Sequence, residues 1–375
     1  MLGNTFGRMF RVTACGESYG DALVAILDGT PAGLAIDDAY IQKELDARRP
    51  GTSPLDSPRK ETDQVHIFAG VRDGVTTGAP LGMIIYNVDR QDIHVKQYFD
   101  VKDLIRPGHA EYTYNVKYGK NADWCGAGRA SGRETCMRVA AGAVAKKILA
   151  KYGIEVLGYV KECAGVRAKD LTFDEVKANY RSNMINCPDE EAAAKMIEKV
   201  LEIKAKGDTA GGVVEVIATG VPAGLGEPVF DKINATIAHG MMSIGSVRGV
   251  EFGEGFNSTR LTGSECNDIP YVKDGKVAFR TNRAGGVEGG ITNGEDIVVR
   301  VAVKPTATIS IDQDTVDLSK MENTKLAAIT RRDPTITARA VAVVEAMLRI
   351  AILDHLMMWK GYDAIQDVDH SEIGL

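Results

Sequence analysis

The sequence predicts an α+β fold in a single large domain with an internal pseudo-repeat. Short apolar segments typical of strands and longer segments with helical periodicity both occur along the 375-residue chain. No linker rich in proline and serine divides the chain, so we expect one intertwined domain over residues 1–360 and a polar tail over 361–375. Two glycine-rich stretches, 69–78 and 285–294, resemble each other and indicate two related halves.

Five short segments are predicted to be strands, because they are apolar and rich in the β-branched side chains that strands favour. The 40 glycines of the chain are concentrated in loops between such segments. The predicted strands cover residues 22–28, 80–87, 212–220, 296–303 and 307–312.

The helices are predicted from the 3.6-residue period and from their end signals. Asp37 is a suitable N-cap for a helix that starts at residue 38, and Gly153 is a stop signal for a helix over 134–153. The remaining predicted helices cover 188–207, 229–243 and 335–358, and the last is apolar enough to be largely buried.

The two glycine-rich stretches share five identical positions, and each leads into a predicted strand. Chance similarity between glycine-rich turns is the alternative explanation. The identical pairs are Gly70 and Gly286, Val71 and Val287, Gly74 and Gly290, Thr76 and Thr292, and Gly78 and Gly294.

Composition excludes several functional classes. The net charge of −6 gives no support for nucleic-acid binding, and no apolar run is long enough to span a membrane. The first residues lack the apolar core of a signal peptide, so we expect a cytoplasmic protein. Six cysteines and six histidines are scattered without CxxC or metal-ligand spacing, so we expect no metal site.

Arginines gather in stretches rich in glycine and proline. Each one alone is as well explained as a solvated loop charge. As a set they predict a pocket for a small molecule with several negative charges, because the guanidinium fork matches carboxylate and phosphate. These arginines are Arg48, Arg49, Arg106, Arg129, Arg133, Arg331 and Arg332.

A glycine-rich loop precedes the helix predicted from residue 134. Such a loop directs backbone N–H groups and the positive end of the helix dipole at one place. Arg129, Ser131 and Arg133 surround that place, which therefore suits a phosphate or the polar edge of a flavin. Neither common nucleotide-binding fingerprint is present.

Two further residues are candidates for proton transfer. His109 follows a proline–glycine turn, and a histidine titrates near neutral pH; a structural hydrogen bond is the alternative role. Asp333 lies among arginines just before the last predicted helix, where it is a candidate proton acceptor; the alternative is helix capping.

Together these segments resemble the chorismate synthase family over almost the whole chain. The resemblance implies a β-α-β sandwich, a homotetramer and a lyase. It implies 1,4-elimination of phosphate from 5-enolpyruvylshikimate 3-phosphate to give chorismate, the last common step of aromatic amino acid biosynthesis, with reduced FMN. NADPH or an external flavin reductase would reduce the flavin. The motifs that carry it include GNTFGRMFRVTACGES, RRPGTS, DGVTTGAPLG, RPGHAEYTY, GRASGRETCMRVAAGA, NRAGGVEGGITNG, KPTAT and RRDP.

The resemblance also implies roles for individual residues. His109 matches the histidine near the reduced flavin, and Asp333 matches the aspartate that helps to remove the ring proton. Ser18, Arg48, Arg49, Arg106 and Arg133 match substrate-binding positions. FMN-binding positions match Arg129, Ala130, Ser131, Gly245, Ser246, Gly289, Lys304, Pro305, Thr306, Ala307, Thr308 and Arg331.

The chain departs from the family pattern at several positions. Tyr19 replaces the histidine of GESHG, which lies near the substrate phosphate and is thought to protonate it. A phenol donates a hydrogen bond but supplies no positive charge. Pro54 stands where an arginine linked to reduced-nicotinamide binding is often found, and Arg283 and Arg332 replace histidines. Two alternatives therefore stay open: a divergent lyase acting on a related phosphorylated cyclohexene, or a flavin- or anion-binding subunit with little catalysis.

Overall fold

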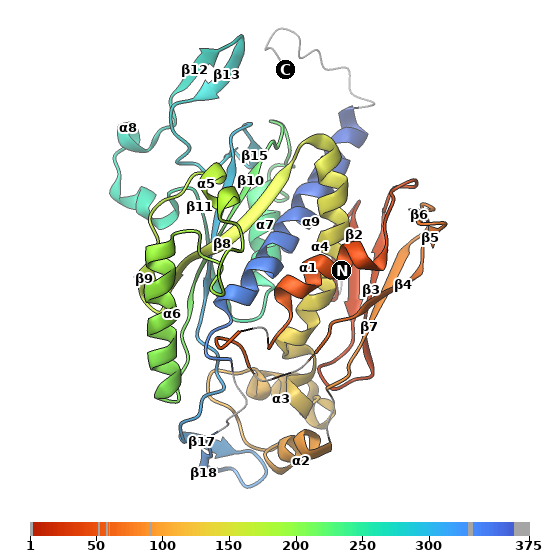
Figure 1. Ribbon diagram of the computed structural model, residues 1–375, viewed down its shortest axis with the longest axis vertical. Helices are drawn as coiled ribbons and strands as arrows, with labels where there is room; N and C mark the ends of the chain where they lie inside the picture. The colour runs from red at the N-terminus through yellow and green to blue at the C-terminus, as the bar shows by residue number, and fades with distance from the viewer. Residues whose placement is uncertain are drawn as a thin grey trace.

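The computed structural model describes residues 3–51, 53–57, 59, 61–89, 92–328 and 333–363. Within them, two five-stranded antiparallel sheets enclose a layer of helices, as Figure 1 shows. The first sheet has the order β1 (Thr5–Phe6), β2 (Arg11–Cys15), β3 (Ala22–Asp28), β7 (Leu81–Tyr86) and β4 (Val65–Ala69). The second has the order β11 (Val247–Phe252), β16 (Ile297–Val303), β10 (Gly212–Thr219), β8 (Glu155–Cys163) and β9 (Val166–Arg167).

The helical layer consists mainly of α1 (Asp38–Arg48), α4 (Thr135–Leu149), α7 (Ile233–Met242) and α9 (Thr337–Asp363). Strand alternation turns Leu23, Ala25 and Leu27 of β3 toward this layer, where they are buried. α4 and α9 cross in close contact, since a Cβ built on Gly142 would lie 2.4 Å from the Ala346 Cβ. The core thus lies between the sheets, which confirms the β-α-β sandwich.

The internal pseudo-repeat is visible in the order of the elements. The strands β2-β3-β7-β4 of the first sheet correspond to β8-β10-β16-β11 of the second, and α1 and α4 correspond to α7 and α9. The glycine-rich stretches form matching ribbons, β5 (Val71–Arg72) with β6 (Val75–Thr76) and β14 (Val287–Glu288) with β15 (Ile291–Thr292).

Matching hydrogen bonds anchor the two ribbons. The Thr76 hydroxyl donates to the Pro31 carbonyl at 2.5 Å and accepts from the Leu34 N–H at 2.9 Å. In the second ribbon, the Thr292 hydroxyl likewise donates to the Pro222 carbonyl at 2.7 Å and accepts from the Leu225 N–H at 2.9 Å. Chance similarity between two turns does not explain this shared geometry.

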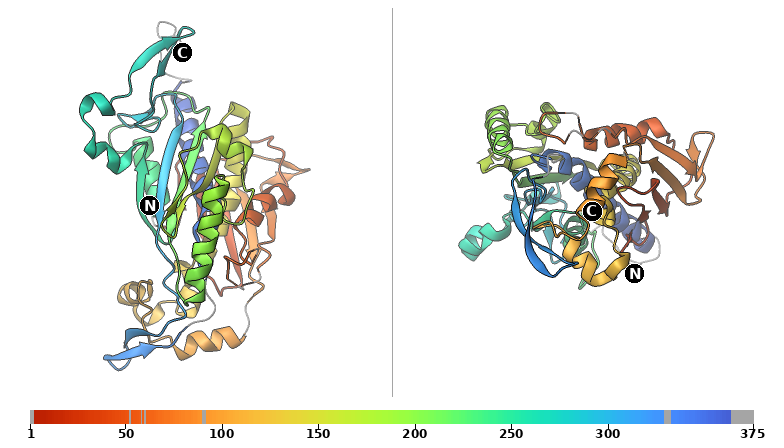
Figure 2. Two further views of the ribbon diagram at one scale, coloured as in Figure 1. Left: turned by 60° about the vertical axis from the view of Figure 1, so that its left-hand side comes forward. Right: turned by 90° about the horizontal axis from the view of Figure 1, so that it is seen from below.

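The remaining elements decorate the sandwich. At its lower end in Figures 1 and 2 lie α2 (Asp92–Asp100), α3 (Glu111–Tyr118) and the ribbon of β17 (Gln313–Asp317) with β18 (Glu322–Leu326). Beside the second sheet lie α5 (Phe173–Ala178) and α6 (Glu190–Ala205). α8 (Gly263–Cys266), β12 (Pro270–Lys273) and β13 (Lys276–Phe279) project from its upper part.

Most predicted elements are present, and one is wrong. Residues 307–312 form no strand: the Ser310 N–H donates to the Gly207 carbonyl, and the next strand, β17, begins at Gln313. The predicted helix over 229–243 begins only at Ile233, because Glu227 and Asp231 pair across a turn. α9 continues to Asp363, three residues into the predicted tail, and residues 364–375 lie outside the described part of the chain.

No helix in the described residues combines the length and apolar character needed to cross a membrane.

Candidate active site

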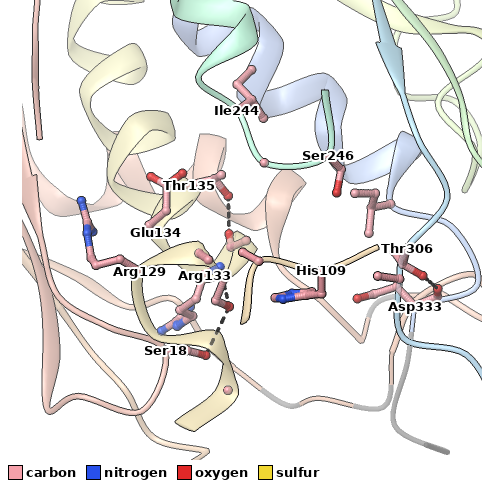
Figure 3. A pocket seen from close by; sticks show the side chains of 18 of the residues that line it. Ser18, His109, Arg129, Arg133, Glu134, Thr135, Ile244, Ser246, Thr306 and Asp333 are labelled. Carbon is pink, nitrogen blue, oxygen red and sulfur yellow. Dashed lines mark hydrogen bonds between the residues drawn. The ribbon is translucent and has the colours of Figure 1, made fainter. Parts of the chain in front are cut away.

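A cleft of about 780 Å³ opens at the end of the sandwich nearest α3. The pseudo-repeat explains why functional residues converge there. Both α1 and α7 end at this cleft, and both α4 and α9 begin at it. Residues far apart in sequence therefore face one pocket, as Figure 3 shows.

The glycine-rich loop forms one wall of the cleft. It consists of the short 3-10 segments η2 (Cys125–Ala130) and η3 (Gly132–Glu134). Gly126 and Gly128 have φ of 58° and 48°, conformations that glycine adopts readily. The Arg129 guanidinium donates to the carbonyls of Gly16 and Ala14 at 3.0 Å and 3.1 Å. Both partners are neutral, so the positive charge of Arg129 is not cancelled there.

Two buried arginines form the floor of the cleft. Arg48, the last residue of α1, pairs with Asp63 at 2.6 Å and donates to the Gly132 carbonyl at 2.9 Å. Arg133 contacts the same Asp63 and donates to the Asn87 Oδ1 at 2.8 Å. Burial raises the pKa of Asp63, but the two guanidiniums outweigh it and hold that pKa below its usual range.

His109 lies in the loop before α3, with its imidazole toward the cleft (Figure 3). Its Nδ1 is 2.9 Å from the Glu111 Oε2, an ion pair whenever the imidazole is protonated. Glu111 also accepts from Arg106, which in turn donates to the Thr308 hydroxyl at 3.2 Å. Burial raises the pKa of Glu111, but the neighbouring His109 and the Arg106 charge outweigh burial, so the net pKa lies below its usual range.

Asp333 faces the cleft from the segment before α9. Its carboxylate accepts from the Arg339 guanidinium at 2.8 Å and from the Ser57 N–H at 3.0 Å. Its carbonyl accepts from the Thr306 hydroxyl at 3.0 Å, drawn in Figure 3. α9 begins four residues later, at Thr337, and the carboxylate makes no helix cap.

The second half of the chain supplies the opposite wall. Gly245 and Ser246 follow α7, and residues 304–308 follow β16. The Lys304 N–H donates to the Ser246 carbonyl at 2.9 Å, so the two segments are held together. Burial and the nearby Arg248 lower the pKa of Lys304.

Positive charge exceeds negative charge in this cleft. Within the described part of the chain, eight arginines and one lysine line it, against three carboxylates. The carboxylates of Asp63 and Glu111 behind them reduce this excess but do not remove it. The cationic residues are Arg48, Arg59, Arg106, Arg129, Arg133, Arg138, Arg248, Lys304 and Arg339. In the same described part, no group of three or more potential ligand side chains could hold a metal ion.

Comparisons with known proteins agree with this geometry. The sequence profile described as "Chorismate synthase" matches residues 10–357. The chain belongs to the chorismate synthase family. A chorismate synthase of Acetivibrio thermocellus is 56% identical over 383 aligned positions, 97% of each chain. One of Methanosarcina mazei is 50% identical over 357 positions, 95% of this chain and 97% of the relative.

A solved structure, described as "Crystal Structure of Chorismate Synthase", matches with a TM-score of 0.76 and 32% identity, covering 94% of this chain and 93% of that one. The relatives and the fold therefore agree. The chain is an enzyme, a carbon–oxygen lyase that forms chorismate, in a family that depends on a flavin.

Tyr19, the residue that departs from the chorismate synthase pattern, does not itself line the cleft but contacts three residues that do. Its ring lies against Gly126, since a Cβ added there would be 2.5 Å from it. The ring also packs edge-on to Tyr98, with centroids 5.4 Å apart, and the Arg59 Cζ is 5.7 Å from its centroid. Arg59 therefore places a positive charge beside the phenol that replaces the family histidine.

A few predicted positions do not line the cleft. Arg49 points to the surface and pairs with Asp46 at 3.6 Å. The Pro305 ring packs against Gly211. Gly289 lies in the turn between β14 and β15, at the end of the molecule opposite to α3 (Figure 1). Arg331 lies outside the described residues.

Four cleft arginines were not among the predicted site residues: Arg59, Arg138, Arg248 and Arg339. Arg339 carried a usable signal, because it is a charge in the apolar first turns of the last predicted helix. Arg138 lies one turn into α4 and donates to the Ser243 hydroxyl at 2.5 Å. Arg59 lies in a polar segment and Arg248 in strand β11, and neither segment has a distinguishing pattern.

Proposed function

We propose that this chain eliminates phosphate from 5-enolpyruvylshikimate 3-phosphate, with reduced FMN bound in the same cleft. One observation carries this proposal: nine cationic side chains surround a single cleft that also contains Asp333 and His109. The substrate has two carboxylates and a phosphate, and FMN has a further phosphate. Ligand pockets are typically about 300–1,000 Å³, so a cleft of about 780 Å³ is a suitable size for both.

The residues of the cleft suit a flavin. Gly132 and Gly245 have no other atom within 4 Å of where a Cβ would be, so both leave room for a bound group. Backbone N–H groups of the glycine-rich loop and the Lys304 charge suit a phosphate. In the proposal, FMN is held by Arg129, Ala130, Ser131, Gly245, Ser246, Lys304, Thr306, Ala307 and Thr308. Reduced flavin held by these residues would supply electron density to the reaction without a net change of oxidation state.

Arg48, Arg106 and Arg133, with Ser18, bind the anionic groups of the substrate in this proposal. Their guanidiniums are already fixed by Asp63, Glu111 and Asn87, so little side-chain entropy is lost when an anion binds. The same fixed charges stabilise the phosphate as it takes up negative charge on leaving.

Asp333 accepts the ring proton in this proposal. Arg339 and Ser57 hold its carboxylate in one orientation at the cleft wall. His109, beside Glu111, places an imidazole ring in the same cleft as the flavin segment 304–308. Tyr19 donates a hydrogen bond to the phosphate, and Arg59 supplies the charge that the phenol lacks.

We further propose a cytoplasmic homotetramer that receives its reduced flavin from an external flavin reductase. Pro54 supports this dependence, because it replaces an arginine linked to reduced-nicotinamide binding; its carbonyl accepts from Lys204 at 2.7 Å. The β14–β15 turn, which contains Gly289, lies at the end of the molecule opposite to the cleft of its own chain (Figure 1). In the proposed tetramer, Gly289 would therefore contact FMN only in the cleft of another chain.

An anaerobic assay with chemically reduced FMN and 5-enolpyruvylshikimate 3-phosphate tests the proposed function. We expect phosphate and chorismate to form in equal amounts, and neither to form with oxidised FMN. If both ligands bind but no product forms, the protein is a binding subunit. Phosphate release from a related phosphorylated cyclohexene alone would show a divergent lyase.

A further inference from the structure

Two carboxylates contact the arginines of the cleft: Glu61 lines the cleft itself, and Asp63 lies directly behind it. The backbone alternates as it approaches β4, so both side chains point inward while Thr62 between them is exposed. Asp63 has φ of 48°, a conformation uncommon for residues other than glycine but tolerated by aspartate. The side chains of both acids have an exposed fraction of 0%.

These two carboxylates bind three arginines between them. The Asp63 Oδ2 is 2.6 Å from the Arg48 Nη1, and its Oδ1 contacts Arg133. The Glu61 Oε1 is 2.8 Å from the Arg59 Nη2, and its Oε2 is 3.5 Å from the Arg133 Nη2. All three arginines line the cleft, whereas Asp63 lies behind it.

We infer that Glu61 and Asp63 are positioning residues that fix Arg48, Arg59 and Arg133 as one array for the substrate anions. The inference rests on the proposed function of this cleft. A carboxylate near an anion site would by charge alone weaken anion binding. Here each carboxylate oxygen contacts a guanidinium, so three long side chains are held in place before the ligand arrives.

A role in stability alone explains the arrangement less well. Buried ion pairs often contribute little net stability compared with apolar residues, because desolvation offsets their attraction. The chain buries such pairs elsewhere too, for example Glu44 with Arg349 at 3.0 Å. Among the ion pairs of the described residues, only those of Glu61 and Asp63 join three arginines of one cleft. These arginines are Arg48 of α1, Arg133 of η3 and Arg59.

Neutralisation of charge and positioning of the arginines predict opposite changes in the affinity of the cleft for anions. If the carboxylates only neutralise charge, Asp63→Asn and Glu61→Gln make the cleft more positive and tighten binding of anions. If they position the arginines, both variants weaken binding, by about 10-fold to 100-fold, as expected for lost charge-assisted hydrogen bonds. KM then rises, and kcat falls as well, because the same arginines stabilise the departing phosphate.

Calorimetric titration of the full chain with 5-enolpyruvylshikimate 3-phosphate measures this effect, with inorganic phosphate as a second probe. Glu44→Gln is the matched control: it lowers the melting temperature but leaves substrate affinity unchanged. If folded Asp63→Asn and Glu61→Gln bind as tightly as wild type, or more tightly, the inference is overturned. If Asp63→Asn does not fold, Glu61→Gln decides, because its partner Arg59 is partly exposed.

Crystal structures of the two variants separate this inference from the proposed function. We expect the Arg48 and Arg133 guanidiniums to be displaced in Asp63→Asn, and Arg59 in Glu61→Gln. If wild type fails to bind 5-enolpyruvylshikimate 3-phosphate, the proposed function fails. The inference about Glu61 and Asp63 is then decided by the arginine positions in the two variant structures. Unmoved arginines would then overturn it.

Discussion

The Arg339 guanidinium lies 2.8 Å from the Asp333 carboxylate, and both residues line the same cleft. Arg339 lies on α9, and its Nε also donates to the Arg48 carbonyl at the end of α1 at 3.0 Å. One guanidinium thus joins the proposed proton acceptor to the segment that carries a proposed substrate ligand. This relationship suggests that Asp333 is placed for chemistry rather than for binding of the flavin.

Asp333→Ala is therefore expected to lower turnover by about 10²–10⁴-fold, the usual range for loss of a general base. FMN affinity, measured by fluorescence titration, should stay close to wild type. Asp312→Ala is a suitable control, because Asp312 accepts from the Ala328 N–H and does not line the cleft. An equal loss of turnover and of FMN affinity would show that Asp333 is structural.

Tyr19→His should increase turnover several-fold below about pH 6.5, where an imidazole is protonated. The imidazolium supplies a proton and a positive charge that the phenol cannot. Tyr19→Phe keeps the ring packing on Gly126 and Tyr98 but removes the hydroxyl, so turnover should fall. The measurement is kcat against pH for the three proteins. If Tyr19→His gains nothing at any pH, the tyrosine is a fully functional replacement.

Gly142→Ala should destabilise the fold by about 1–3 kcal/mol, a typical cost of overpacking. The added Cβ would be 2.4 Å from the Ala346 Cβ and 2.6 Å from its Cα, so α4 and α9 must separate. Gly263→Ala is the control, since no other atom lies within 4 Å of its added Cβ. Urea unfolding measures both. Equal stability of Gly142→Ala and wild type would contradict the close packing of the two helices.

Glu44 should make the fold sensitive to acid. Burial raises its pKa, but Arg349 and Lys146 outweigh that effect and lower it from 4.5 to about 2. Because the pKa is lower in the folded state, Glu44 stabilises the fold above its unfolded pKa. This stabilisation is lost as the pH falls from about 4.5 toward about 2. Thermal unfolding across this range should show a weaker pH dependence for Glu44→Gln; an unchanged slope would refute the assignment.

The sequence predicted the regular elements well where local signals were strong. Asp37 caps α1 by accepting from the Tyr40 N–H at 2.8 Å, and Gly153 ends the α4 region with φ of 72°. The apolar segment 307–312 was misjudged because its β-branched residues satisfy a local pattern. Its backbone is instead held by a tertiary partner, Gly207, which no local pattern reveals.

The site was predictable in outline, since Arg48, His109, Arg129 and Asp333 all face one cleft. Their partners were not. Asp63 and Glu111 are ordinary acids in the sequence, and only the folded chain shows that their carboxylates hold the cleft arginines. Arg49 and Arg48 are adjacent, yet the end of α1 turns one outward and the other inward.

The correspondence between the two sheets has an evolutionary consequence. A polypeptide of half this length could enclose such a cleft only by pairing with its own duplicate, and both members would then have supplied identical groups. A single chain is free of that constraint. The first half lines the cleft mainly with guanidiniums, such as Arg48 and Arg133, whereas the second supplies Asp333 together with Arg248, Lys304 and Arg339.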